Sequence, residues 1–380
     1  MDFSLNEDQL ALREAVRRFC EAEYPAERRG DPESPDLEAK RWQGMSDLGL
    51  PGLAISTRWG GSGLGAAEVM LATRELGRVL GGGAFISGAI LAGGLLERAG
   101  SEDQMKRWLP DLVHGRLRIA AALFEDGRRY DWRHCGTRAT HSPDGYSISG
   151  SKTLVLHADG AQVFLVLART SNDDRDAQGL SLFAVQAGTP GVDIQGFDTL
   201  DGRRAANVTF NSANVGADGL VGEPGGAAPH VEAALDAANA ALCGEAVGAV
   251  EALISLTAEH LRNRVQFGSA LAKFQALQHK VADQAAALEL LDSMACAAAM
   301  AMAAETPVAT RQRLVSAAKA MAAEVGRNAG AAAIQLHGGM GMTRECRVGH
   351  YAKRLLVIGK LFGDQSFHLE RFRSLEKIHP

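Results

Sequence analysis

The spacing of apolar residues divides the chain into a helical segment, a segment of short strands and a second helical segment. Apolar residues recur every three or four positions in EDQLALREAVRRFCEAEY, AAEVMLATRELGRVL and EDQMKRWLPDLV, which is the period of an amphipathic helix. From about residue 119 short runs rich in Val, Ile, Leu and Phe, such as GYSISGSKTLVL and LSLFAVQ, are separated by Gly, Asp, Asn and Pro. Such runs predict antiparallel strands.

After VGEPGGAAP the helical period returns, over about residues 230–267, 271–304 and 306–337 and again beyond residue 343. Four helices with short connections predict an antiparallel bundle. We therefore expect an α+β protein with an N-terminal helical domain (1–115), a central antiparallel β domain (116–222) and a C-terminal four-helix bundle (223–380).

Charge and cysteine content narrow the classes of function. The net charge of −5 gives no electrostatic reason to expect a nucleic acid or an anionic membrane as a partner. We identify no apolar run long enough to cross a bilayer, and the opening MDFSLNEDQLALREAV is charged where a signal peptide needs an apolar core. The five cysteines form no C-x-x-C pair or zinc-like spacing, so we expect free thiols, no metal site and a cytoplasmic protein.

Common catalytic motifs are missing. The chain contains no G-x-G-x-x-G, no P-loop and no G-x-S-x-G. A nicotinamide-binding Rossmann domain, a kinase and a serine hydrolase therefore have little support.

Two segments of the C-terminal half carry more specific signals. In RNRVQFGSALAKFQALQHKVAD, Arg264 and Phe267 lie where one helix ends and Gln275 lies where the next begins. In QLHGGMGMT, Gln335 and the glycines end another helix. Each segment alone is compatible with ordinary helix capping, but glycines also let backbone N–H groups approach a phosphate.

Together these segments make the chain similar to the acyl-CoA dehydrogenase family over nearly its whole length. The resemblance rests on RVQFG and FQ followed by QLHGGMG, on GYSISGSK, which matches the family's G-x-x-L-N-G-x-K turn, and on the opening DFSLNEDQLALREAVRRF. It implies α,β-desaturation of an acyl-CoA thioester with FAD as cofactor. It also implies an oligomer, because each FAD lies between the β domain of one subunit and the bundle of its neighbour.

The resemblance assigns the cofactor contacts. It implies that Arg264 pairs with the FAD pyrophosphate, that Phe267 packs on the cofactor and that Gln275 belongs to the same cofactor-binding set. Gln335, Gly338 and Gly339 would receive the adenine-side phosphates of a neighbour's FAD. A guanidinium suits a pyrophosphate because its N–H groups form a fork that matches phosphate oxygens.

The chain departs from the family pattern at the catalytic base. Many members place a Glu in an E-G-T stretch, where this chain has Phe362, Gly363 and Asp364. A second group places the base on the helix before R-x-x-F-G, at the position that Ala238 occupies here.

The β domain departs as well. In place of the family's T-E-P the chain has LFEDG, which keeps Glu125, and in place of W-I-T beside the flavin it has Leu154, Val155 and Leu156. Such a flavin contact can still be made by the backbone.

The apolar stretch ALCGEAVGA contains one carboxylate, Glu245. It lies seven residues after Ala238, which is two helical turns, or about 10 Å along the same face. As a base displaced along the helix, Glu245 is expected to have a pKa raised by burial. The alternatives are that Glu245 pairs with an arginine across the bundle or faces solvent. Asp236 and Asp364 are weaker base candidates, and Glu251 is expected on a polar face.

These departures, with the tail HYAKRLLVIGKLFGDQSFHLERF, are similar to the smaller subunit of heteromeric bacterial acyl-CoA dehydrogenases that act on steroid side chains or pimeloyl-CoA. We expect a homo- or heterotetramer that acts on a bulky or dicarboxylic acyl-CoA and includes a homologous larger subunit as partner. We expect it to pass electrons to an electron-transfer flavoprotein or another acceptor. The alternative is a catalytically silent subunit that completes the FAD site of a homologous subunit. A third class, oxidation of a nitrogen compound on the same fold, has less support.

Overall fold

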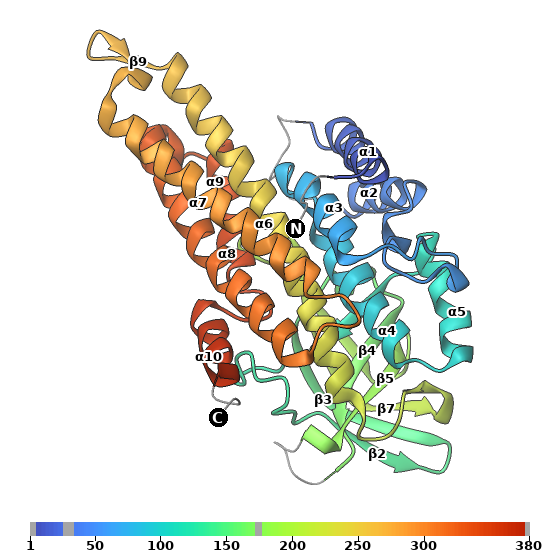
Figure 1. Cartoon of the computed structure of the whole chain (residues 1–380). Coiled ribbons are helices and arrows are strands. Elements are labelled where there is room, and N and C mark those ends of the chain that lie inside the picture. The colour runs from blue at the N-terminus through green and yellow to red at the C-terminus, as the bar shows by residue number, and fades with distance from the viewer. Residues whose placement is uncertain (1–4, 26–33, 172–176, 377–380) are drawn as a thin grey trace. The chain divides into compact units, whose positions relative to one another are not determined.

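The chain forms two compact units, each assembled from separate parts of the sequence (Figure 1). The computed structural model describes residues 5–25, 34–171 and 177–376. The helical unit takes residues 1–32, 65–82 and 239–380, and the sheet unit takes residues 33–64 and 83–238. This division differs from the expected changes at residues 115 and 222, because the N-terminal helices are shared between the two units.

The sheet unit contains an eight-stranded sheet with strand order β6-β7-β3-β2-β4-β5-β8 and with β1 beside β4. Its strands are β1 (Ile119–Ala122), β2 (Arg138–Ser142), β3 (Gly145–Leu156), β4 (Val163–Arg169), β5 (Leu180–Gln186), β6 (Val192–Asp198), β7 (Arg204–Gly216) and β8 (Leu220–Val221). The predicted antiparallel pairing holds for most neighbours, but β1 and β2 both pair parallel with β4. Phe164, Phe183 and Phe210 lie at most 1% exposed in the core of this sheet.

The helices of the sheet unit are α2 (Pro35–Asp47), η4 (Phe85–Gly93), α4 (Gly94–Ala99) and α5 (Glu102–Val113). The element η4 is a π-helix that follows three glycines, where the sequence indicated only a break. It packs on β1, and its buried side chains continue the core beyond the sheet.

The helical unit consists of long helices and one small hairpin. Its elements are α1 (Glu7–Glu23), α3 (Ala66–Arg78), α6 (Ala227–Asn263, which begins in the sheet unit), β9 (Val265–Gln266), β10 (Ser269–Ala270), η8 (Leu271–Lys273), α7 (Gln275–Met300), α8 (Val308–His337), η9 (Gly338–Met342), α9 (Arg347–Ile358) and α10 (Gln365–Glu376). Asn6 and Gln9 form a capping box at the start of α1, which agrees with the helical period of EDQLALREAVRRFCEAEY. Helix α8 packs against α7, α9 and α10.

Helix α6 corrects one expectation from the sequence. By length and composition it is apolar enough to cross a membrane, although we expected no such run. However, 72% of its apolar window is buried inside the protein, so its apolar character is that of a core helix.

Helices α3 and α6 touch backbone to backbone through glycines. A Cβ atom at Gly248 of α6 would collide with the backbone oxygen of Arg74, and one at Gly77 of α3 would collide with the backbone oxygen of Glu245. At Gly244, four residues before Gly248, a Cβ would collide with the hydroxyl of Thr73. Glycine at these positions therefore sets the separation of the two helices.

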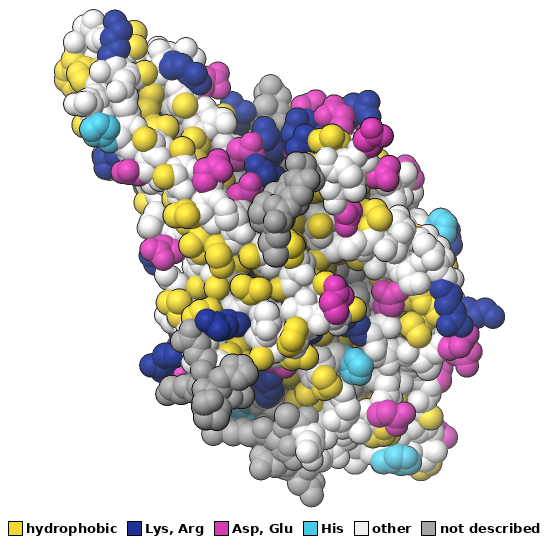
Figure 2. All heavy atoms as spheres, viewed as in Figure 1, with side chains coloured by type: hydrophobic (Ala, Val, Ile, Leu, Met, Phe, Trp, Pro, Cys, Tyr) yellow, Lys and Arg dark blue, Asp and Glu magenta, His cyan; other side chains and the backbone are white. Residues whose placement is uncertain are grey.

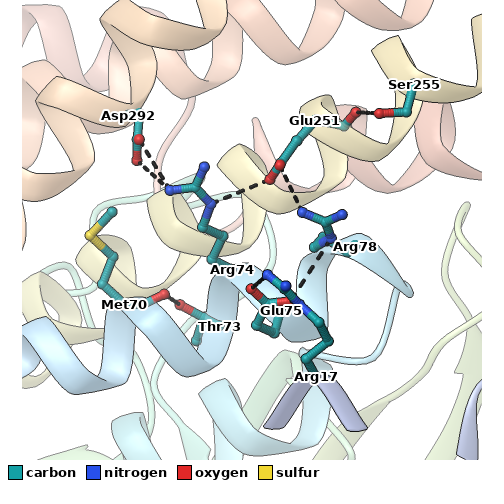
Figure 3. A network of polar contacts seen from close by, with 9 residues as sticks. All are labelled: Arg17, Met70, Thr73, Arg74, Glu75, Arg78, Glu251, Ser255 and Asp292. Atoms are coloured by element: carbon teal, nitrogen blue, oxygen red, sulfur yellow. Dashed lines mark hydrogen bonds and ion pairs between the residues drawn. The ribbon is translucent and has the colours of Figure 1, made fainter. Parts of the chain in front are cut away.

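An alternating network of arginines and acids joins α1, α3, α6 and α7 at the edge of this contact (Figure 3). Arg74 of α3 donates to Glu251 of α6 over 3.3 Å and to Asp292 of α7 over 3.1 Å. Arg78 donates to the second oxygen of Glu251 over 2.7 Å. On the other side of α3, Glu75 accepts two hydrogen bonds from Arg17 of α1. The network ties four helices together with ion pairs that are half-buried between α3, α6 and α7 and include the buried Glu75 between α1 and α3.

Replacing Arg74 with alanine is expected to lower the free energy of unfolding by about 1 kcal/mol, because it removes the contacts to both α6 and α7 from a half-buried position. The measurement is chemical denaturation. Arg373→Ala is the control, since its pair with Glu370 is exposed on both sides and is expected to contribute close to nothing. Equal effects of the two substitutions would contradict a special role for the network.

Candidate functional site

The hairpin between α6 and α7 exposes an aromatic ring. Phe267 is 88% exposed and has a φ of 57°, a left-handed conformation that phenylalanine rarely adopts. Its ring meets Phe274 edge to face, with 6.1 Å between centroids. A fixed and exposed aromatic tip is suited to packing on a flat ligand or on another chain.

Arg264 and Gln275 flank this tip. Both are exposed, and the Arg264 guanidinium forms no hydrogen bond or ion pair with any other residue that the structure describes. Gln275 is the first residue of α7, a helix of 26 residues whose N-cap provides no side-chain hydrogen bond. An arginine without an internal partner and the positive end of a helix both suit an anionic group such as a pyrophosphate.

The glycines that end α8 are open on their outer side. Gly338 has a φ of 62°, and its N–H donates to the Gln335 carbonyl. This segment therefore caps the C-terminus of α8, as one of the two interpretations from the sequence expected. Apart from their chain neighbours, no residue that the structure describes places an atom within 4 Å of a Cβ on Gly338 or Gly339, and Gln335 is exposed. The same turn can therefore cap the helix and admit a phosphate.

These two segments border one cavity of about 370 Å³ in the helical unit. We call it the histidine recess; its lining residues are Leu256, Glu259, His260, Asn263, His337, Met340, Thr343, Glu345, Cys346, Arg347 and Val348. His260 and His337 stack within it, with ring centroids 4.2 Å apart and planes at 24°. The end of α6, next to Arg264, and the turn at Gly338 thus meet at the same end of the bundle.

In the sheet unit, Glu125 organises the loop between β1 and β2. Its carboxylate accepts hydrogen bonds from the Lys152 ammonium over 2.7 Å, from the backbone N–H of Gly136 over 2.7 Å and from the backbone N–H of Thr137 over 2.9 Å. Burial alone would raise the pKa of Glu125, but the Lys152 charge and these hydrogen bonds outweigh burial and lower the pKa to about 2. Glu125 is therefore an ionised anchor for the loop.

The Glu125 anchor predicts a dependence of stability on pH. Because the pKa in the folded state lies below its ordinary value, the stabilisation is present above about pH 4.5 and is lost as the pH falls through 2, with an upper limit of about 3 kcal/mol. Glu125→Gln should therefore be less stable than the parent at pH 7, and the difference should shrink between pH 4.5 and pH 2. Urea denaturation across that range measures it, with exposed Asp126→Asn as the control. A difference that stays constant with pH would contradict the ionised anchor.

The β3 segment that the resemblance places beside the flavin is irregular. The register between β3 and β7 shifts between Lys152 and Val155, and Leu154 there has a φ of 52° and is 39% exposed. A bulge of this kind redirects the backbone of a strand and is frequent next to active sites. The irregularity supports a flavin contact through backbone groups, although Leu154 and Leu156 lack the polar side chain of W-I-T.

Glu245 lies in the interior of the helical unit and is 0% exposed. Its two carboxylate oxygens accept hydrogen bonds from Nε and Nη2 of Arg354 in α9, over 2.8 Å and 2.6 Å. A Cβ at Gly82 would lie 2.8 Å from the Glu245 carboxyl carbon, so a side chain there would have to displace the carboxylate. These contacts agree with the alternative in which Glu245 pairs with an arginine across the bundle.

The other carboxylates considered as base or polar-face residues lie in structural positions. Asp364 accepts from the Phe367 N–H over 3.0 Å and so caps α10. Asp236 is 0% exposed within α6. Glu251, expected on a polar face, belongs to the arginine network. Phe362 has a φ of 56° and holds the position of the family's E-G-T glutamate with a half-buried phenyl ring.

The Glu245–Arg354 pair is expected to be strongly coupled. Glu245→Leu or Arg354→Met alone should lower the free energy of unfolding by about 3 to 5 kcal/mol, because each leaves one buried charge without its partner. The double variant should lie much closer to the parent, since no charge remains buried. Denaturation of all four proteins measures the coupling energy. The same cycle on the exposed pair of Glu370 and Arg373 should give a value near zero, and additivity at Glu245 and Arg354 would contradict the pair.

Three parts of the site were not recognised from the sequence. Arg354 lies 109 residues from Glu245, and no local pattern connects the two. Lys152 is the last residue of the GYSISGSK motif, which marked this position as one that the family shares. The motif did not indicate that Lys152 pairs with Glu125. The stacking of His260 on His337 depends on how α6 and α8 pack.

Comparison with known proteins gives matches along nearly the whole chain. Residues 6–116 match the model of the acyl-CoA dehydrogenase N-terminal domain, residues 120–213 the middle domain and residues 228–372 the C-terminal domain. The probable acyl-CoA dehydrogenase YngJ of Bacillus subtilis is 28% identical, over 95% of this chain and 96% of that protein. The caffeyl-CoA reductase-Etf complex subunit CarC of Acetobacterium woodii is 27% identical, over 90% of this chain and 91% of that protein.

Among solved structures, a variant of the Tcur3481-Tcur3483 steroid ACAD is similar, with a TM-score of 0.86 and 26% identity, over 98% of this chain and 99% of that one. The expected fold, a helical N-terminal domain, a middle β domain and a C-terminal helical domain, is confirmed.

Proposed function

Because the chain belongs to the acyl-CoA dehydrogenase family, we propose that it is one subunit of an enzyme in which a homologous subunit supplies the catalytic base. The family identifies the protein as an FAD-dependent oxidoreductase that acts on the CH–CH bond of an acyl-CoA. In α,β-desaturation a carboxylate removes the α-proton, and FAD supplies the acceptor for the β-hydrogen. In our proposal the homologous subunit, and not this chain, provides that carboxylate.

The proposal rests on the burial and the hydrogen bonds of Glu245. A general base must come within about 2.6 to 3.2 Å of the atom whose proton it removes. Glu245 is fully buried and both of its oxygens are bonded to Arg354, while the two usual base positions hold Phe362 and Ala238. A substrate would have to displace the guanidinium to reach Glu245, which supports a structural role for that carboxylate.

The remaining site residues suit cofactor binding. In this proposal Arg264, Gln275 and Gln335 contact the FAD phosphates, helped by the open N–H groups of Gly338 and Gly339. Phe267 packs against the cofactor of a neighbouring subunit. Their exposure, and the lack of an internal partner for Arg264 among the described residues, support these assignments.

A surface on α7 supports assembly with a homologous subunit into a tetramer. Leu290 is 61% exposed and Met300 is 47% exposed, and four alanines between Gln275 and Leu290 are also exposed. Hydrophobic side chains are frequent along the helical bundle in the view of Figure 2. Apolar surface of this kind is typical of contacts between protein chains.

Similar proteins support the finer assignments. The similar steroid ACAD supports a bulky acyl-CoA as substrate and a heteromeric assembly. The similar subunit of the caffeyl-CoA reductase-Etf complex supports an electron-transfer flavoprotein as acceptor. Five free cysteines support a reducing, cytoplasmic environment.

A second candidate is that Glu245 itself is the base. Its position two turns beyond Ala238 on α6 favours it, as does Gly82, which presents no side chain to the carboxylate. In that case Arg354 would have to move when substrate binds.

Flavin reduction in the double variant Glu245→Leu, Arg354→Met distinguishes the two candidates. The variant chain is co-expressed with its homologous subunit, and bleaching of the flavin is followed with a panel of bulky and dicarboxylic acyl-CoAs. We expect a rate within about twofold of the parent, since no buried charge is left unpaired. A loss of 100-fold or more with FAD still bound would identify Glu245 as the base and contradict the proposal.

A further inference from the structure

Helix α8 buries a lysine that forms no ion pair with any residue that the structure describes. Lys319 is 0% exposed, and its ammonium donates a hydrogen bond to the backbone carbonyl of Gly363 over 3.0 Å. A charge in the interior is costly unless an opposite charge accompanies it, and fully buried lysines are almost always paired. The partner of this lysine is instead a backbone carbonyl in the turn between α9 and α10.

Neutral groups from two other helices lie close to Lys319. Cys243 of α6 and His368 of α10 are both 0% exposed. Burial raises the pKa of the Cys243 thiol to about 12, which the charge of Lys319 offsets only in part. Burial, and then the charges of Lys319 and Arg371, lower the pKa of His368 well below its ordinary value. Near pH 7 neither group provides the negative charge that would pair with an ammonium.

Two charged residues of the turn act on Lys319 in opposite directions. Asp364 favours its charged form and Lys360 disfavours it. Burial is the largest influence and lowers the pKa of Lys319 to about 8, from an ordinary value of 10.5. The ammonium is therefore still mostly charged at pH 7, and keeping it in the interior lowers the stability of the fold. A group that lowers stability in this way is expected at a functional position.

The turn that accepts the hydrogen bond has a strained backbone. Phe362 has a φ of 56°, which phenylalanine rarely adopts, and Gly363 has a φ of 131°. A Cβ at Gly363 would lie 2.4 Å from Nε2 of His368, so a side chain there would have to displace the imidazole. Strained conformations persist only where the surrounding structure holds them. The bond from Lys319 holds this turn from α8, a helix outside the turn.

The strained turn lies at the position where many acyl-CoA dehydrogenases have their base, which is Phe362 in this chain. At one end of the turn the N–H of Leu361 donates to the Val357 carbonyl and continues α9, and at the other end Asp364 caps α10. The bond from Lys319 adds a contact in the middle of the turn. The half-buried phenyl ring is therefore fixed at the place of the family's base, although it is no longer a carboxylate.

We propose that Lys319 is a positioning residue, which fixes the Phe362 side chain at the place of the family's base by holding the Gly363 carbonyl. The phenyl ring then gives the acyl group an apolar contact where relatives present a carboxylate. Lys319 acts only through the turn and contacts neither substrate nor cofactor in this role. The proposal rests on the proposed function in one respect, since it takes the base to come from the homologous subunit.

Hydrogen–deuterium exchange of the purified full-length chain tests the hold on the turn without substrate or turnover. In Lys319→Met the backbone amides of residues 359–364 should exchange about fivefold faster or more than in the parent, because methionine fills the space but donates no hydrogen bond. Urea denaturation at pH 7 should show that the variant is at least as stable as the parent, since a buried charge is removed. Faster local exchange without a loss of global stability separates positioning from a merely structural role.

Two further variants control this experiment. Lys360→Met removes a lysine of the same turn that is 70% exposed, and it should leave the exchange of the turn unchanged. Lys319→Gln should return the exchange to within about twofold of the parent, because its amide can donate to the same carbonyl without a charge. Unchanged exchange in Lys319→Met, or a lower denaturation midpoint than the parent at pH 7, would overturn the proposal.

A split between substrate binding and rate tests the consequence for the reaction. The chain is co-expressed with its homologous subunit, and bleaching of the flavin is followed over a range of phenylpropionyl-CoA concentrations. Lys319→Met should raise the concentration for the half-maximal rate about threefold or more and leave the maximal rate within about twofold, because an apolar contact is loosened while the base is unchanged. A fall of about tenfold in the maximal rate at an unchanged half-saturating concentration would overturn the role of Phe362. The exchange experiment needs no turnover, so its result is independent of which subunit provides the base.

Discussion

The buried pair of Glu245 and Arg354 is the interaction on which the account of this protein depends. Two charges in the interior are stable only when each satisfies the other, and here both carboxylate oxygens are bonded to one guanidinium. The pair joins α6 to α9 at the place where glycines bring α3 against α6. Another arrangement of these helices would leave one of the two charges buried alone.

The same pair also bears on which carboxylate acts as the catalytic base. The family reaction needs a carboxylate at the substrate α-carbon, and this chain has Phe362 and Ala238 at the two usual positions. With Glu245 held by Arg354 and Asp364 capping α10, the candidate carboxylates of the helical unit have structural partners. The groups that remain exposed are those suited to FAD, which fits a chain that completes a cofactor site while a homologous subunit removes the proton.

Features set by local sequence were predictable. The apolar run at Gly145–Leu156 coincides with β3, and the helical period at Glu102–Val113 coincides with α5. The order of helices, strands and helices, together with the motifs RVQFG, QLHGGMG and GYSISGSK and the opening segment, was enough to identify the fold and the family. These signals depend on the period of side chains along one element and need no knowledge of its neighbours.

Features set by contacts between distant segments were not predictable. Glu245 was recognised as unusual because it is a charge among small apolar residues, but its partner lies on another helix that the pattern does not connect to it. The parallel pairing of β1 with β4, the π-helix η4 and the stacking of His260 on His337 likewise depend on tertiary packing.

The most direct test of the central claim is a crystal structure of the complex of this chain with its homologous subunit, FAD and a bound acyl-CoA analogue. The quantity to measure is the distance from the substrate α-carbon to the nearest carboxylate oxygen. We expect that a carboxylate of the homologous subunit lies within reach of the α-carbon and that Glu245 stays bonded to Arg354. A Glu245 oxygen facing the α-carbon, with Arg354 displaced, would contradict it.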